Sequence, residues 1–493
     1  MLFNSWTFAL FLIGIFAFYY QVGRSRSGLA QIVLLTIASY VFYAWQNPWL
    51  VILLLCSTWI NAFVSLKLTE RGTSPPARKR WVQIGIVCNV AVLAFFKYAS
   101  LLVSTFLPKV WWTHWGFDLS AIPLPIGISF FTFQGISLVV DVYRAEGKGI
   151  PGLEPPTTRR ESWWLLLRMA FFKAFFPQLV AGPIVKAHEF MYQIGAKRFC
   201  QIDWEDAVRK LVLGFFFKMV VADNLKEATQ AIAYPTFTTL PSAQLLLLLY
   251  GYSIQIFADF CGYSMIAMGL ARLFGYQLPL NFEFPYISAS ITEFWRRWHI
   301  SLSSWLKQYL YIPLGGNRKG LPRTYVNLMV VMLLGGLWHG AAWSYMVWGG
   351  VHGLFLAIER ALGCKGTSPR DDPAPSLWHW VTTALRIFLT FNLVSLLWLL
   401  FKLPQFGDAV LYVKGIAALR PGLIPQSSFV IIFFSLPVVF YHLYELFKEP
   451  LLASFRTWPS PAQYGAKVTA FGLLFFMVLV NSGTKGDFIY FQF

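Results

Sequence analysis

Residues 335–353 read Gly335-Gly-Leu-Trp-His-Gly-Ala-Ala-Trp-Ser-Tyr-Met-Val-Trp-Gly-Gly-Val-His-Gly353, an apolar stretch with two histidines and no carboxylate, lysine or arginine. Polar side chains at membrane depth are costly unless they find a partner, so imidazoles here indicate a function. The alternative is a histidine that only bonds a neighbouring helix. Small residues four apart, at Gly336 and Gly340 and again at Gly349 and Gly353, let helices approach closely in lipid. We therefore predict that His339 lies where helices pack tightly.

The composition is that of an integral membrane protein. Of the 493 residues, 57% are hydrophobic and 13% are charged, whereas soluble domains carry about 25% charged residues. The net charge of +18 does not indicate a nucleic-acid partner, because the lysines and arginines cluster in short loops between apolar runs. Such loops are typical of the cytoplasmic side of a membrane protein surrounded by lipid. The surplus charge could also attract an anionic donor.

The cysteines indicate neither a disulfide framework nor a metal site. The five of them are scattered, without a CxxC pair or the spacing of metal ligands. The first apolar run begins near Leu2 and lacks both a basic segment before it and a small-residue cleavage site, so we expect it to remain as a membrane helix.

The apolar runs predict an all-α, polytopic membrane protein with about 10–12 membrane helices. We expect spans at 4–21, 29–46, 49–66, 81–107, 126–143, 208–233, 241–258, 325–348, 349–361, 377–402, 425–446 and 464–482. The basic loops 67–80 and 144–162 should face the cytoplasm, which leaves the N-terminus outside. His114 is interpreted as an interfacial residue. We expect one transmembrane domain over 1–493, without a soluble domain or an internal repeat.

Two segments carry features that are unusual for a simple span. In 163–186, Pro177 and the Gly182-Pro183 pair should interrupt the helix, and broken backbone at membrane depth is tolerated only in the protein interior or along a cavity. An ordinary kinked span is the alternative. In 126–143, several polar side chains should face the protein interior. Asp259 lies in apolar surroundings and must pair with another group.

Residues 290–320 predict one helix in the plane of the membrane interface. Ser290 and Glu293 fit a capping box. An apolar stripe follows at Phe294, Trp298, Leu302, Trp305 and Tyr309, while Arg296, Arg297, Ser303, Ser304 and Lys307 occupy the other side. His299 lies at the border of these two faces. The glycine-rich turn 315–320 ends the helix.

The spacing of the histidines restricts the chemistry. On one straight helix His339 and His352 are about 20 Å apart, so they cannot share a substrate atom unless Gly349-Gly350 breaks the helix. His299 comes from another element and could converge on His339. No GxSxG, P-loop or HExxH motif is present. We therefore expect direct transfer assisted by a base, without a covalent enzyme intermediate.

Five segments resemble the membrane-bound O-acyltransferase family, in particular its bacterial alginate O-acetyltransferase branch: Glu293-Phe-Trp-Arg-Arg-Trp-His-Ile-Ser-Leu-Ser-Ser-Trp305, Tyr311-Ile-Pro-Leu-Gly-Gly-Asn-Arg-Lys-Gly320, Gly335-Gly-Leu-Trp-His-Gly-Ala-Ala-Trp343, Phe176-Pro-Gln-Leu-Val-Ala-Gly-Pro183 and Phe260-Cys-Gly-Tyr-Ser264. The resemblance runs from about residue 80 to 360, most densely over 120–360. It implies broken, re-entrant and interfacial helices around a central catalytic channel.

The resemblance also implies the site. His339 matches the near-invariant histidine, and His299 matches a second catalytic position that is Asn or Asp in other branches. We expect His339 to act as a neutral general base, and His299 to orient the thioester or donate a hydrogen bond to the oxyanion. Candidate donor-binding residues are Arg296, Arg297, Trp298, Ser303, Asn317, Arg318, Lys319, Trp338 and Trp343. Candidate channel-lining residues are Gln178, Pro183, Asp259 and Tyr263.

The implied activity is the transfer of an acyl group, most simply acetyl, from a cytoplasmic thioester such as acetyl-CoA, with no bound cofactor or metal. The group would cross the bacterial inner membrane to an alginate, cellulose or similar exopolysaccharide, through a periplasmic SGNH-type acyltransferase or acceptor protein of a polysaccharide biosynthesis or secretion complex. An acetyl transporter or flippase, a peptidoglycan O-acetylation subunit and a structural subunit of a secretion complex are the alternatives.

Overall fold

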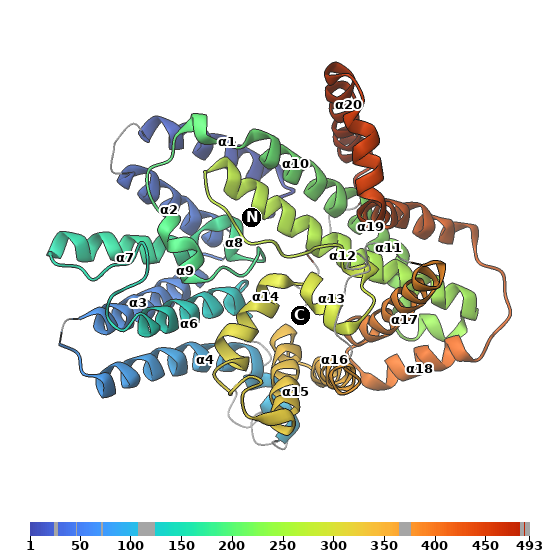
Figure 1. Cartoon of the computed structure of the whole chain (residues 1–493), viewed down its shortest axis with the longest axis horizontal. Coiled ribbons are helices and arrows are strands. Elements are labelled where there is room, and N and C mark those ends of the chain that lie inside the picture. The colour runs from blue at the N-terminus through green and yellow to red at the C-terminus, as the bar shows by residue number, and fades with distance from the viewer. Residues whose placement is uncertain are drawn as a thin grey trace. The chain divides into compact units, whose positions relative to one another are not determined.

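The computed structural model describes residues 1–23, 28–45, 47–70, 72–106, 124–363, 376–483 and 488. Within these ranges every named element is a helix (Figure 1). Seven of the described helices are long and apolar enough to cross a membrane: α3 (Leu50–Thr69), α4 (Pro75–Phe106), α12 (Ser242–Leu273), α15 (Gly320–His339), α17 (Leu377–Lys402), α19 (Phe429–Arg456) and α20 (Ser460–Val480). The chain is therefore an all-α, multi-pass membrane protein. His114 lies outside the described residues.

Two of the expected spans correspond to shorter apolar helices. These are α1 (Trp6–Val22) and α2 (Leu29–Ala44), where spans at 4–21 and 29–46 are expected. The helix α18 (Phe406–Ala417) was not predicted. The chain forms two compact units, Met1–Leu211 with Ile266–Pro279, and Val212–Met265 with Leu280–Phe493. The single domain over 1–493 stays a prediction.

The first unit buries the polar side chains of α6 (Ile128–Arg144), as predicted. Almost the whole helix is buried, including Ser129, Gln134 and Asp141. Asn61 of α3 and Asn89 of α4 exchange side-chain hydrogen bonds of 2.7 and 3.2 Å. These bonds satisfy amides that would otherwise be costly inside an apolar bundle.

The predicted interruption within 163–186 is confirmed. The helix α7 (Arg159–Ala174) ends at Phe175, and a short helix, α8 (Phe176–Leu179), follows with Pro177 in its first turn. Proline is tolerated there because the first N–H groups of a helix have no partner within it. All of residues 175–187 are buried, so the broken backbone lies inside the protein.

The second unit contains α13 (Ile291–Arg297), α14 (Ile300–Leu306), a π-helical segment Lys307–Tyr311, α15, α16 (Trp343–Ala361) and the helices that follow. The segment expected as one span at 208–233 is instead α10 (Trp204–Phe215), a π-helical segment Phe216–Ala222, α11 (Asp223–Ala228) and a short 3-10 turn. The helix α12 continues beyond its expected end and carries Asp259 in its middle.

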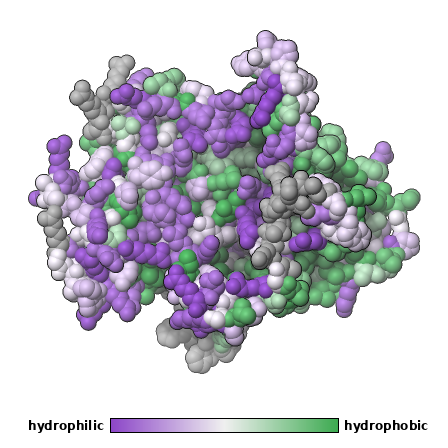
Figure 2. Space-filling view, in the orientation of Figure 1, coloured by the Kyte–Doolittle hydropathy of each residue, from purple (hydrophilic) through white to green (hydrophobic). Residues whose placement is uncertain are grey.

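Large apolar side chains cover parts of the outer surface of this unit. Figure 2 shows apolar residues gathered over α17 and α18, at the right of the view. Phe388 and Leu389 of α17 are 59% and 57% exposed. An exposed apolar surface of this kind fits contact with lipid.

Candidate active site

The predicted interfacial helix begins at Ser290, as the sequence indicates. Ser290 Oγ accepts a hydrogen bond from Glu293 N at 3.0 Å, and the Glu293 carboxylate accepts one from Ala289 N at 2.9 Å. These bonds satisfy donors that the first turn of a helix leaves free. The helix α13 then ends early, because Trp298 has extended backbone angles and His299 lies in the left-handed region with φ 45°.

The break at His299 is held by the extended segment that precedes α13. Phe282 and Trp298 form an isolated antiparallel bridge, and Ile300 N donates to Asn281 O at 3.0 Å. A residue that is not glycine adopts a positive φ only where its surroundings enforce it. The prediction of one helix over 290–320 is therefore wrong. The apolar stripe has helical spacing throughout, and it does not reveal the bridge to Phe282 that ends α13.

The side chain of Asn281 also orients the His299 ring. Its Oδ1 accepts from Ser301 Oγ at 2.8 Å, its Nδ2 donates to Ser264 Oγ at 3.1 Å, and Oδ1 lies 3.0 Å from His299 Nδ1. Because a carbonyl oxygen only accepts, Nδ1 carries the proton and Nε2 is the acceptor nitrogen of the neutral ring.

His299 lies between α13 and α14, outside the helices that span the membrane. Burial lowers the pKa of His299 to about 3, so its ring is neutral near pH 7. A hydrogen bond from Nε2 to an oxyanion would require the charged ring. The orienting role expected for His299 therefore fits this geometry better than the oxyanion role.

His339 is the last residue of α15, which ends where Gly340 adopts extended backbone. A Cβ at Gly340 would lie 2.2 Å from the Tyr345 ring, so only glycine fits this turn. α15 and α16 are two helices joined by a tight turn. The expected bounds of the spans 325–348 and 349–361 are therefore wrong, because the helix ends at Gly340 and not at Gly349-Gly350. The straight helix that was one of the two alternatives for His339 and His352 is not present.

The glycines predicted to let helices approach are the points where α15 and α16 meet. A Cβ on Gly336 would lie 2.2 Å from Tyr345 O, and a Cβ on Gly349 would lie 2.1 Å from Met332 O. Neither position has space for a side chain. This confirms the close packing predicted around His339.

The two breaks bring the predicted histidines together. The ring centroids of His299 and His339 are 6.4 Å apart. The His339 ring packs against Trp338, Trp348 and Phe401 at 5.1, 5.2 and 5.1 Å between centroids. Both histidines are buried, at 0% and 4% exposed. Two imidazoles thus share one largely apolar, aromatic environment.

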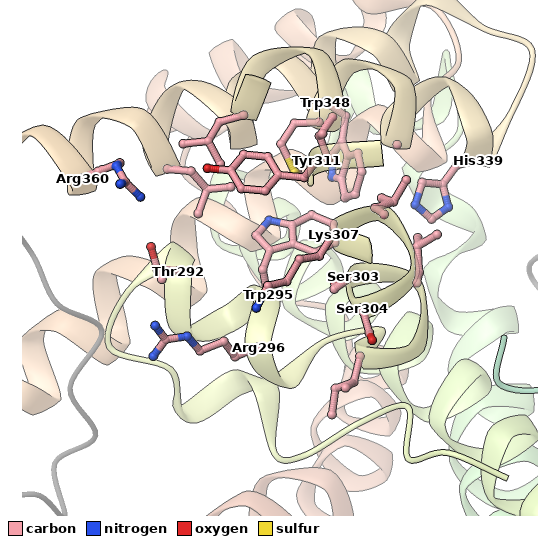
Figure 3. Close-up of a pocket in the computed structure, with 18 residues that line it drawn as sticks. Thr292, Trp295, Arg296, Ser303, Ser304, Lys307, Tyr311, His339, Trp348 and Arg360 are labelled. Atoms are coloured by element: carbon pink, nitrogen blue, oxygen red, sulfur yellow. The ribbon is translucent and has the colours of Figure 1, made fainter. Parts of the chain in front are cut away.

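A cavity of about 530 Å³ extends from His339 between α13, α14, α15 and α16. His339 and Trp348 are among its lining residues, together with apolar side chains such as Leu306 and Met332. Figure 3 shows Arg296 and Arg360 on the side of the cavity away from His339. The cavity therefore has an imidazole at one end, apolar walls, and cations at the other end.

A second cavity of about 290 Å³ adjoins the first, since both are lined by Lys307, Tyr311 and Arg360. Asn317 and Arg318 also line it. Three positively charged side chains therefore surround this smaller cavity, which suits an anionic group.

The candidate donor-binding residues divide into two sets. Arg296 and Ser303 line the larger cavity, Asn317 and Arg318 line the smaller one, and Trp338 contacts both histidine rings. Arg297, Trp298, Lys319 and Trp343 line neither cavity. Arg297 instead forms a 2.9 Å ion pair with Glu293, and Trp298 stacks on Phe294 with centroids 5.5 Å apart.

The candidate channel-lining residues lie elsewhere in the fold. Asp259 forms a 2.8 Å ion pair with Lys218, which supplies the partner that its burial demands. Tyr263 stacks on Phe488, with centroids 4.5 Å apart. Gln178 donates to Phe172 O at 2.7 Å, and Pro183 is buried in the first unit. None of the four lines either cavity described above.

Sequence reasoning missed several residues of this site. Lys307 and Arg360 line both cavities, Trp295 lines the larger one, and Asn281 holds His299. Lys307 could have been predicted as a donor-binding residue, because it lies with Arg296 on the polar side, opposite the apolar stripe. Asn281 gave no local signal, because its partners are 17 to 20 residues away along the chain.

Comparison with known proteins identifies the family. The model of MBOAT, the membrane-bound O-acyltransferase family, matches residues 2–364. The chain belongs to this family. Membership of this family makes the chain an acyltransferase. This activity is compatible with two buried histidines, one of which lines a cavity.

Individual relatives cover most of the chain. A probable alginate O-acetylase AlgI from Pseudomonas aeruginosa is 39% identical over 407 residues, which is 82% of this chain and 72% of the relative. A peptidoglycan O-acetyltransferase from Helicobacter pylori is 35% identical over 437 residues, 85% of this chain and 80% of the relative. A teichoic acid D-alanyltransferase from Streptococcus thermophilus is 33% identical over 300 residues, 56% of this chain and 68% of the relative.

Proposed function

We propose that the protein transfers an acetyl group from acetyl-CoA on the cytoplasmic side toward a polysaccharide outside the membrane. The observation that carries the proposal is an apolar cavity with His339 at its inner end and cations at its outer end, where the His339 ring lies 6.4 Å from the buried His299 ring. Acetyl-CoA has parts that match this cavity: a small acetyl group, a long uncharged arm and an anionic end that carries phosphates.

In this proposal the phosphates lie near Lys307, Arg318 and Arg360, which line the smaller cavity. The uncharged arm lies along the apolar wall of α15, past Met332 toward His339. Exclusion of water from such a site strengthens the electrostatic interactions within it and limits hydrolysis of the thioester.

The reaction itself needs one base beside the hydroxyl that attacks the carbonyl carbon. Nε2 or Nδ1 of His339 takes the proton of the acceptor hydroxyl while its oxygen attacks the thioester carbonyl. A C–O bond forms, the C–S bond breaks, and the proton passes from the imidazolium to the departing thiolate. His299 orients the reacting groups, and its neutral ring offers Nε2 as an acceptor.

The final acceptor is proposed from the polymers for which the relatives are named. The relatives named for acetylation of alginate and of peptidoglycan support an acceptor of the polysaccharide class. We propose an exopolysaccharide of the alginate or cellulose type, reached through a periplasmic SGNH-type acyltransferase or acceptor protein. Peptidoglycan is the second candidate acceptor, because of the Helicobacter pylori relative.

The test is the release of CoA by the purified protein in lipid nanodiscs, with acetyl-CoA as donor and acetylated alginate or peptidoglycan fragments as products. We expect turnover that requires a hydroxyl acceptor or the partner protein. Uptake of acetyl groups into sealed vesicles without thioester cleavage would instead indicate a transporter. No turnover with acetyl-CoA, but turnover with an acylated carrier protein, would correct the donor.

The proposal also includes an orientation of the chain in the membrane. We propose that the protein lies in the bacterial inner membrane with its N-terminus in the periplasm, because the loops 67–80 and 144–162 are basic. In intact cells, a membrane-impermeant thiol reagent should not reach the cysteine introduced by Arg78→Cys into a variant whose five native cysteines are replaced by serine. Labelling from outside would contradict this orientation.

A further inference from the structure

His352 is a buried histidine that the catalytic scheme does not use. It lies on α16, fully buried, and it does not line the larger cavity. Its ring stacks on Phe294 with an interplanar angle of 8° and meets Trp295 and Trp348 edge-on, at 5.3 and 4.7 Å between centroids. Both indoles line the cavity, so His352 supports two of its walls.

One hydrogen bond fixes the state of this ring. Trp295 Nε1 donates to His352 Nδ1 at 3.3 Å. An indole nitrogen can only donate, so Nδ1 of His352 must be the acceptor and the neutral ring carries its proton on Nε2. A second proton on Nδ1 would remove the bond. His352 is therefore an acceptor for Trp295 and is not available there as a proton donor.

The same face of α16 also forms hydrogen bonds with the start of α13. Glu359, seven residues after His352, accepts hydrogen bonds from Ile291 N at 2.6 Å and from Thr292 N at 2.8 Å. Glu359 thus fixes the start of α13, and His352 fixes its middle, where Trp295 precedes Arg296. Figure 3 shows the Trp295 indole between the Arg296 end of the cavity and His339.

We propose that His352 is a positioning residue that holds the Trp295 indole in place as a wall for the arm of the acyl thioester, and so sets donor affinity. This inference rests on the proposed function of the cavity as the donor site. It assigns His352 to binding and leaves the chemistry to His339 and His299. A purely structural histidine would change stability without changing donor binding.

The test separates binding from chemistry. We would measure kcat and KM for acetyl-CoA, and Kd for CoA alone, in wild type, His352→Leu, His352→Asn and Trp295→Phe. His352→Leu should raise KM and Kd about tenfold, as expected for the loss of one hydrogen bond, with kcat within about twofold. His352→Asn should recover most of the affinity, because its amide oxygen can accept near the position of Nδ1.

A double variant gives the sharper comparison. If the residues act through one another, His352→Leu combined with Trp295→Phe should bind CoA about as weakly as either single variant. Unchanged KM and Kd in His352→Leu, a loss confined to kcat, or multiplied losses in the double variant would each overturn the inference. Kd for CoA does not require turnover. If wild type bound CoA but did not transfer acetyl, the proposed function would fail and the binding test would still stand.

Discussion

The two histidines of the site lie at two helix breaks that are built differently. His299 is itself the residue in the unfavourable left-handed conformation, and a bridge and Asn281 hold it there. His339 keeps helical geometry, and the glycine that follows it makes the turn. One break depends on polar bonds from a distant segment, the other on the absence of side chains. Two differently built helix breaks thus bring the ring centroids of two imidazoles to a distance of 6.4 Å.

The largest expected effect comes from removing His339, the proposed base, at the glycine break. His339→Ala should lower kcat at least about a hundredfold, since general-base catalysis typically contributes 10²–10⁴-fold. The measurement is CoA release from acetyl-CoA at saturating acceptor. His379→Ala, on α17 and outside both cavity linings, is the matched control and should keep normal activity. Near-wild-type turnover in His339→Ala would contradict the assignment.

The glycine break should be sensitive to a single added methyl group. Gly336→Ala places a Cβ 2.2 Å from Tyr345 O, so α15 and α16 must separate. Overpacking of this kind typically costs about 1–3 kcal/mol. We expect a lower Tm and about a tenfold lower kcat, because His339 shifts with the helix. In Gly472→Ala, the added Cβ meets nothing within 4 Å, so this control on α20 should behave as wild type. Equal Tm values for the two variants would show that the helices can adjust.

The polar break should respond to the loss of one acceptor. Asn281→Leu removes the bonds to His299 and Ser301, and we expect kcat to fall about fivefold to tenfold, the size of one or two net hydrogen bonds. Asn281→Asp keeps an acceptor toward His299 and should retain more activity. Equal losses in both variants would indicate that the amide acts only through packing.

The smallest expected effect concerns the cations at the outer end of the cavity. Arg296→Gln should raise the KM for acetyl-CoA about threefold and weaken its salt dependence, because an exposed charge attracts the donor without touching the reacting atoms. Arg297→Gln is the neighbouring control, since Arg297 pairs with Glu293 and lines neither cavity. If both variants changed KM equally, the cavity would not be the donor entrance.

Sequence reasoning predicted the helices and the site to different degrees. Apolar length located most of the spans, and the small-residue spacing predicted the close approach at Gly336 and Gly349. Periodicity did not reveal either break, because Trp298 to Ile300 and His339 to Trp343 keep an apolar pattern across a change in backbone direction. These breaks depend on Asn281, Phe282 and Tyr345, whose contacts exist only after folding.

Resemblance to a family predicted His299 and His339 as the catalytic pair, whereas the cavity could be found only in the structure. Arg296 and Ser303 line it as candidates, but Arg297 and Trp298, adjacent in sequence, lie outside its lining. A helix presents neighbouring residues to different surroundings, so a motif names more residues than a site uses. Lys307 and Arg360 come from separate elements and converge only in three dimensions.

We propose that the two breaks build one catalytic unit, and a double-mutant cycle on kcat measures whether His299 and His339 act together. His299→Ala should be severely impaired, and His299→Asn less so, because an amide can still make a polar contact there. If the histidines act as a unit, the variant lacking both should be no more than about threefold slower than the slower single variant. Losses that multiply, measured in the same lipid with normal Tm for each variant, would contradict the account.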